Sequence, residues 1–170
     1  MKLILFVGLM VILPLVQVAI APLFPIAGAN FDFALVVLAL LMVFAGPRVF
    51  MVALPVTALL LGFVSDHSPA LLLVAYLPML PLAAYVADLR VPLNRYAQTL
   101  LAGAATGVFA RLLLSLAAVA QGADFGLSYA LGQVALPGAF LDLGLLTILY
   151  FPLRFVGWVP QPTSLQRGGF

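Results

Sequence analysis

Charged side chains are scarce in this chain of 170 residues: only 7% are charged, whereas 66% are hydrophobic. A soluble domain averages roughly 25% charged and 45–50% apolar residues. Because so few polar groups cannot cover the surface of a water-soluble protein, lipid must surround most of the chain. A helix that crosses the ~30 Å hydrocarbon core of a bilayer needs about 20 apolar residues. The sequence therefore has room for about six such helices and no separate soluble domain.

Other absences narrow the chemistry. The chain has no cysteine, which excludes disulfides, thiol catalysis and cysteine metal sites. It has no Gly-rich phosphate loop, HExxH or GxSxG motif, and its single histidine, His67, lies in a loop beside Asp66. These two residues are too few for a metal site, and no triad spacing surrounds the histidine. Without these motifs we expect no enzyme activity and no cofactor. The basic residues are scattered singly, so we expect no nucleic-acid partner.

Six apolar segments follow one another between Pro, Gly, Asp and Arg residues: 3–24, 33–45, 50–64, 70–86, 96–120 and 129–158. They predict an all-α integral membrane protein with six transmembrane helices in a single domain, residues 1–170. The second segment is short, so we expect it to extend at one end or to cross with little tilt. Ala19-Ile20-Ala21 imitates a signal cleavage site, but Pro22 would follow the cut, and we expect the segment to be retained.

Loop charges predict the orientation. Every loop Lys or Arg falls on the side of both termini: Lys2, Arg48, Arg90, Arg95, Arg154 and Arg167. The opposite loops carry Asp32, Asp66 and Asp124. Basic loops remain in the cytoplasm, so both termini should be cytoplasmic. Tyr96, Tyr150 and Trp158 fall near the expected cytoplasmic interface, a depth that amphipathic rings favour.

Two charges lie deep inside apolar segments. Arg111 follows Arg95 by 16 residues, and Asp142 precedes Arg154 by 12 residues. At ~1.5 Å per residue, their heights above the cytoplasmic loops are about 24 and 18 Å, a difference that an arginine side chain can bridge. An ionised group at that depth costs roughly 2.5–3.5 kcal/mol, so we predict an ion pair or a small polar network. Such a pair fits either a packing clamp between helices, which we favour, or a ligand pocket or proton relay.

Small and polar residues surround this pair. Gly103, Gly107 and Arg111 recur at steps of four and share one helix face, and Gly138 precedes Asp142 by four residues. The GxxxG of the first two glycines predicts close approach of two helices. Gln17 inside the first segment should hydrogen-bond a neighbouring helix, with a contact to a partner protein as the alternative. Six prolines interrupt the apolar segments and predict kinks: Pro14, Pro55, Pro78, Pro81, Pro137 and Pro152.

The order of several motifs resembles a known family. Asp32 opens the second segment, which ends in Pro47-Arg48, and Gly62 and Asp66 form a Gly-x-x-x-Asp at the end of the third. The chain then ends in a helix running into Tyr-Phe-Pro-Leu-Arg, residues 150–154. This order, with the chain length and orientation, resembles MreD, the rod shape-determining membrane protein of bacteria. His67-Ser68-Pro69 departs from the family, which usually follows that aspartate with a Gly-containing loop.

The resemblance implies a non-enzymatic role in the bacterial inner membrane. Proteins of this family belong to the cell-elongation machinery that builds peptidoglycan, and they bind MreC, a bitopic membrane protein. MreC links them to RodA, its transpeptidase and the MreB filament. The family's fold resembles the substrate-binding S-components of vitamin uptake transporters, so a small-molecule-binding transporter subunit is the alternative expectation.

Overall fold

A computed structural model describes residues 12–23, 25, 29–88 and 94–157. These residues form helices joined by short connections, so the chain is an all-α integral membrane protein. After a helical segment at Ile12–Leu23 that ends in the 3₁₀ turn η1 (Ala21–Leu23), the elements are α2 (Phe33–Phe44), α3 (Pro47–Val64), α4 (Pro69–Tyr76), α5 (Met79–Asp88), α6 (Arg95–Ala120), α7 (Leu127–Tyr129), the π-helix η2 (Ala130–Ala135) and α8 (Leu136–Phe155).

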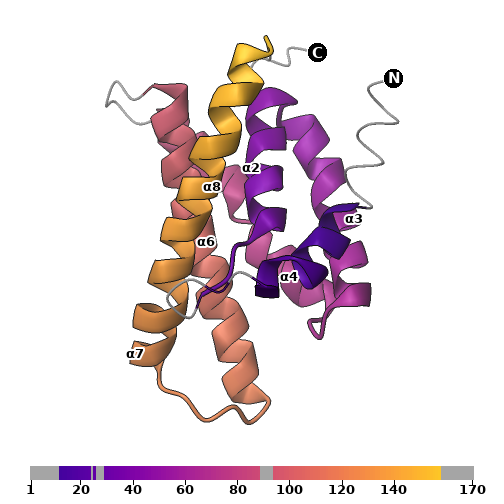
Figure 1. Cartoon of the computed structure of the whole chain (residues 1–170), viewed down its shortest axis with the longest axis vertical. Helices are drawn as coiled ribbons and strands as arrows, with labels where there is room; N and C mark the ends of the chain where they lie inside the picture. The colour runs from indigo at the N-terminus through magenta and orange to yellow at the C-terminus, as the bar shows by residue number, and fades with distance from the viewer. Residues whose placement is uncertain (1–11, 24, 26–28, 89–93, 158–170) are drawn as a thin grey trace.

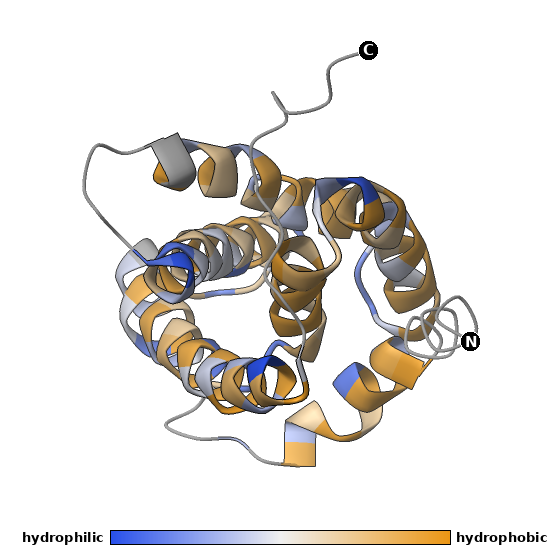
Figure 2. Cartoon of the chain, turned by 90° about the horizontal axis from the view of Figure 1, so that it is seen from above, coloured by the Kyte–Doolittle hydropathy of each residue, from blue (hydrophilic) through white to orange (hydrophobic). Residues whose placement is uncertain are grey.

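Within the described residues, four helical stretches are long and apolar enough to cross a membrane: Pro47–Val64, Pro69–Val86, Arg95–Ala120 and Ala130–Phe155. Ile12–Leu23 and Phe33–Phe44 are shorter apolar helices. Together they correspond to the six predicted segments. Hydrophobic residues occupy the outward faces of the bundle as well as its interior (Figure 2), which is the arrangement that a lipid environment requires.

Polar and special residues set the helix boundaries. The side chains of Asp32, Ser68 and Asn94 each accept a hydrogen bond from a backbone N–H in the first turn of α2, α4 and α6. Such caps satisfy donors that have no partner within the helix. Between α2 and α3 the chain turns at Gly46, whose φ of 94° suits glycine, and Pro47 begins α3, a position where its missing N–H costs nothing.

Helix α2 is the centre of the bundle. All of its residues except Phe33 and Val37 are buried, and it contacts α3, α6 and α8. Its 12 residues span only about 18 Å, less than the ~30 Å of a hydrocarbon core. The expectation that this segment lengthens at one end is wrong, because the Asp32 cap fixes its start and the Gly46 turn follows its end.

Two of the other segments are interrupted at or beside prolines that were predicted to kink them, Pro78 and Pro137. The predicted segment 70–86 is two helices, α4 and α5, interrupted at Leu77-Pro78. The predicted segment 129–158 begins with η2, after which Pro137 lies in the first turn of α8. Pro55 and Pro152 lie inside α3 and α8.

From α2 onward, successive spans of the bundle run in alternate directions. The starts of α3 and α6 and the end of α8 lie at the upper end of Figure 1, whereas the α3–α4 and α6–α7 connections lie toward the lower end. The described arginines of these upper termini are Arg48, Arg95 and Arg154, which agrees with the predicted clustering of basic loops on one side. We call this upper end the arginine end.

Rings pack around the end of α2 nearest the arginine end. The ring of Tyr150 lies 5.2 Å from that of Phe44 and 5.1 Å from that of Tyr96, measured between centroids. Tyr96 also shares a 2.8 Å hydrogen bond between its hydroxyl and that of Thr147. Tyr150 is 0% exposed, so its ring packs in the core of the bundle rather than against lipid; its depth, four residues before Arg154, is compatible with the predicted one. Trp158 and the start of the first segment lie outside the described residues.

Candidate functional site: a polar network inside the bundle

The predicted ion pair between Arg111 and Asp142 is present. Arg111 of α6 donates from Nη1 to Oδ2 of Asp142 of α8 at 2.5 Å. Both side chains are more than 90% buried. Their depth, about 24 Å along α6 from Arg95, places the pair inside the membrane-crossing part of the bundle, where each charge needs a partner.

Glycines make room for this pair. A Cβ atom added to Gly138 would collide with the guanidinium of Arg111, and one added to Gly107 would lie 3.3 Å from its Nη1. Gly103 faces Leu146 of α8, whose Cδ1 would lie 3.3 Å from an added Cβ. The three predicted packing glycines thus lie between α6 and α8, and two of them border the charge pair.

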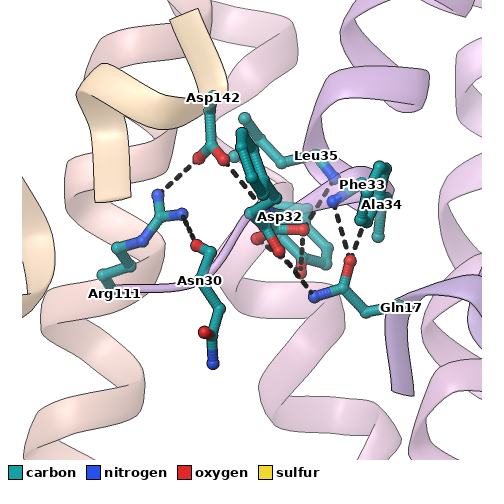
Figure 3. Close-up of polar contacts among 10 residues, drawn as sticks. Gln17, Asn30, Asp32, Phe33, Ala34, Leu35, Arg111 and Asp142 are labelled. Carbon is teal, nitrogen blue, oxygen red and sulfur yellow. Dashed lines mark hydrogen bonds and ion pairs between the residues drawn. The ribbon is translucent and has the colours of Figure 1, made fainter. Parts of the chain in front are cut away.

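The ion pair also binds the chain just before α2. Arg111 donates from Nη2 to the backbone carbonyl of Asn30 at 3.2 Å. Asp142 accepts, through Oδ1, the backbone N–H of Asp32 at 2.8 Å. Figure 3 shows these contacts side by side, with Asp142 above the chain and Arg111 beside it. The pair therefore holds a third segment, not only α6 against α8.

Asp32 extends the network to α4. Its carboxylate accepts the Leu35 N–H at 2.9 Å, which caps α2, and the hydroxyl of Tyr76 at 2.9 Å through Oδ2 and 3.2 Å through Oδ1. Asp32 is 8% exposed and Tyr76 is 2% exposed. The prediction that Asp32 is a loop charge at the outer surface is wrong, because the residue caps a helix that begins inside the bundle.

Gln17 approaches the start of α2 from the opposite side (Figure 3). Its Oε1 accepts the N–H groups of Phe33 at 2.7 Å and Ala34 at 3.4 Å, and its Nε2 donates to the Phe31 carbonyl at 3.1 Å. The predicted hydrogen bond to a neighbouring helix is thus present. Gln17 does not touch Arg111 or Asp142 directly; the backbone around Asp32 joins them.

These contacts have one physical purpose in common. The backbone at residues 30–34 lacks helical partners for several of its polar groups, and in lipid an unsatisfied backbone group costs several kcal/mol. Five backbone groups of this stretch bond to the side chains of Arg111, Asp142 and Gln17. Non-helical backbone is tolerated at membrane depth where protein surrounds it, and this network supplies the polar part of that surrounding.

Sequence reasoning missed Tyr76 and the backbone of Asn30. Tyr76 lies in an apolar run, and no spacing links it to Asp32, 44 residues earlier. The available signal was the shortness of the second segment, since a helix too short to span must begin or end inside the bundle.

Other motif residues lie apart from the network: Arg48 and Asp66 are exposed near opposite ends of α3. The described residues contain no group of three or more His, Asp or Glu side chains placed to hold a metal ion.

The fold and the network define a multi-pass α-helical membrane protein whose central helix begins at a buried polar cluster. No protein-family model, curated protein or solved structure matches the chain.

Proposed function

We propose that this protein is a non-enzymatic scaffold of the bacterial cell-elongation machinery in the inner membrane, acting in the manner of MreD. It binds the transmembrane helix of an MreC-like bitopic protein and, through it, associates with RodA, its transpeptidase and MreB. Its contribution is to help maintain rod shape during peptidoglycan synthesis.

The observation that carries this proposal is that the buried charged side chains already bond to one another and to the backbone. Within the described part of the chain, three charged side chains are buried: Asp32, Arg111 and Asp142. Each is bonded to another or to the backbone at the start of α2. This favours the packing clamp over a ligand pocket or proton relay, because these groups already support the fold.

The residues that carry the resemblance to MreD support it further, since they set the helix boundaries. Asp32 caps α2 and Pro47 opens α3. A Cβ atom on Gly62 would collide with the ring of Pro69, so glycine permits the close approach of α3 and α4 at their turn. A motif of such residues specifies a bundle shape rather than a reaction.

We assign the binding surface for the partner helix to the outward face of α8 and η2. Five exposed residues recur there at steps of four: Gly132, Leu136, Phe140, Gly144 and Ile148. Nothing lies within 4 Å of a Cβ atom added to either glycine. In lipid, small residues at which backbones can approach drive helix association, and the bulky residues between these glycines would flank a docked helix.

A substitution on this face tests the proposal. In a rod-shaped host whose own MreD has been replaced by this chain, Gly144→Leu should round the cells and abolish co-purification of the MreC-like protein in mild detergent. The matched control is Ala105→Leu, an exposed small residue on α6, which should leave both unchanged. A host that stays round with the unaltered chain, or an unaltered chain that retains no such partner, would refute the scaffold role.

The same purification tests the alternative of an S-component-like transporter subunit. Recovery of a transporter ATPase module in place of the bitopic protein would favour it. The cavity between α2, α5 and α6 gives this alternative little support, because its volume of about 20 Å³ has room for roughly one water.

A further inference from the structure

The helices of this bundle reach different distances from the arginine end. The α6–α7 connection lies furthest from it, the α3–α4 connection lies less far, and the start of α2 is nearer than either (Figure 1). From Arg95 to Val119 helix α6 rises about 36 Å, whereas the 12 residues of α2 rise about 18 Å. The end of the bundle opposite the arginine end, which we call the far end, is therefore stepped rather than level.

The outward side of α6 is apolar almost to the far end. Leu116 and Val119 are 55% and 42% exposed, and they lie about 7 and 12 Å beyond Arg111 along the helix. Apolar side chains that are exposed at this height favour hydrocarbon around them. On this side of the bundle, lipid tails must therefore extend well past the level of the Arg111–Asp142 pair.

The start of α2 presents a polar group at a smaller height. Asn30 is exposed, and its position is fixed, because Arg111 binds its carbonyl at 3.2 Å and its neighbour Ala29 is buried. Its side-chain amide points away from the ion pair (Figure 3). An amide surrounded by hydrocarbon would lack hydrogen-bond partners, which costs free energy. Water or lipid headgroups must therefore meet Asn30 at the level of Arg111.

We propose that this protein thins the bilayer locally: beside the start of α2, the headgroups and water of the leaflet at the far end descend to Asn30, whereas the outward side of α6 keeps a leaflet of full thickness. Lipid adapts to a short hydrophobic span by local thinning at modest cost. The polar contact stops at Asn30, because Asp32 and the first turn of α2 that it caps are buried behind it. This contact with lipid is independent of the partner face on α8 and of the proposed scaffold role.

The chain has no cysteine, so single-cysteine variants can report where water reaches. The purified full chain in dioleoyl-phosphatidylcholine vesicles is treated on both sides with a charged, membrane-impermeant maleimide. Asn30→Cys should react at least about tenfold faster than Leu116→Cys, because a charged reagent is excluded from hydrocarbon. Leu116 is the matched control: it is exposed and lies about 7 Å further toward the far end than Arg111, so a bilayer of uniform thickness would give the reverse order. His67→Cys, in the exposed α3–α4 connection, marks full reactivity.

Bilayer thickness supplies a second measurement, which needs no variant. The unaltered chain should be more stable to heat in dimyristoleoyl- than in dierucoyl-phosphatidylcholine, because thinning a thicker bilayer costs more. Labelling of Asn30→Cys should slow in the thicker lipid for the same reason. The substitution keeps the carbonyl that binds Arg111, and circular dichroism checks that each cysteine variant is folded.

Several results would overturn the proposal. Asn30→Cys might be as well protected as Leu116→Cys, or both could react as fast as His67→Cys; in either case the bilayer would have one thickness around the bundle. Greater stability of the unaltered chain in the thicker lipid would contradict the proposed thinning. Labelling of Asn30→Cys that does not change with the lipid would also contradict it, because water would then enter through a cleft in the protein.

Discussion

The two ends of α2 are held by opposite means. At its start, the buried side chains of Arg111 and Asp142 and the half-buried side chain of Gln17 bond to backbone groups. At its end, the rings of Phe44 and Tyr150 pack together and the chain leaves through a glycine turn. The start lies at membrane depth, where backbone groups find no water, whereas the end lies near the surface, where water can satisfy them. The difference shows that polar residues are used here where the backbone is interrupted inside lipid.

The largest expected effect comes from breaking the charge pair at the start of α2. Arg111→Met leaves Asp142 buried without its cation, and removal of one member of a buried pair costs about 3–5 kcal/mol. The measurement is unfolding of the purified protein in detergent, followed by circular dichroism. Replacing both residues, as Arg111→Met with Asp142→Leu, should cost less than the single change because no lone charge remains.

The control for this experiment is Arg154→Met, since Arg154 is an exposed arginine in the last turn of α8. Surface substitutions of this kind usually change stability by less than about 0.5 kcal/mol. If Arg111→Met were as mild as this control, the ion pair would not hold the start of α2.

The second effect concerns the space beside the pair. Gly138→Ala places a methyl group on the guanidinium of Arg111, and such overpacking typically costs about 1–3 kcal/mol. Gly144→Ala, six residues later on the same helix, meets nothing within 4 Å and should be neutral or stabilising, because alanine favours helix more than glycine does. Equal unfolding midpoints for the two variants would show that Arg111 can move aside freely.

Hydrophobic runs and helix geometry were enough to predict the helical segments and the ion pair. Arg111 and Asp142 stand out because each is the single charge deep in its run, and helix rise alone brings them to similar heights. Asp32 could not be placed in the same way. It lies between two apolar runs, where a loop charge is the natural interpretation, and only the three-dimensional position of α2 shows that this point is inside the bundle.

Tyr76 and Tyr150 escaped prediction for a related reason. Both are tyrosines in apolar runs, and composition gives them the same preference for the membrane interface. Their environments differ because of packing between distant segments: the Tyr76 hydroxyl meets Asp32, whereas the Tyr150 ring is enclosed by the rings of Phe44, Tyr96 and Phe151. Contacts over such separations do not follow from local periodicity.

The third prediction removes one hydroxyl at the polar end of α2. Tyr76→Phe takes away the hydrogen bond to the Asp32 carboxylate and leaves its Oδ2 without a donor among the described residues. We expect a loss of about 1.5 kcal/mol in the free energy of unfolding, which is typical for a buried hydrogen bond of this kind. The same substitution in a chain that already carries Asp32→Asn should cost less. Equal costs in both backgrounds would mean that Tyr76 acts through packing rather than through Asp32.

The smallest effect is expected at the other end of α2. The Tyr150 hydroxyl is buried and has no hydrogen-bond partner among the described residues, so Tyr150→Phe keeps the ring contacts and removes only an unsatisfied polar group. The variant should be as stable as the unaltered chain or more stable, since an unpaired buried donor costs free energy. A loss as large as that of Tyr76→Phe would reveal a polar partner for Tyr150, such as a bound water. Polar groups at both ends of α2 would then be hydrogen-bonded, and the two ends would differ only in the partner, which is a side chain at the start and water at the end.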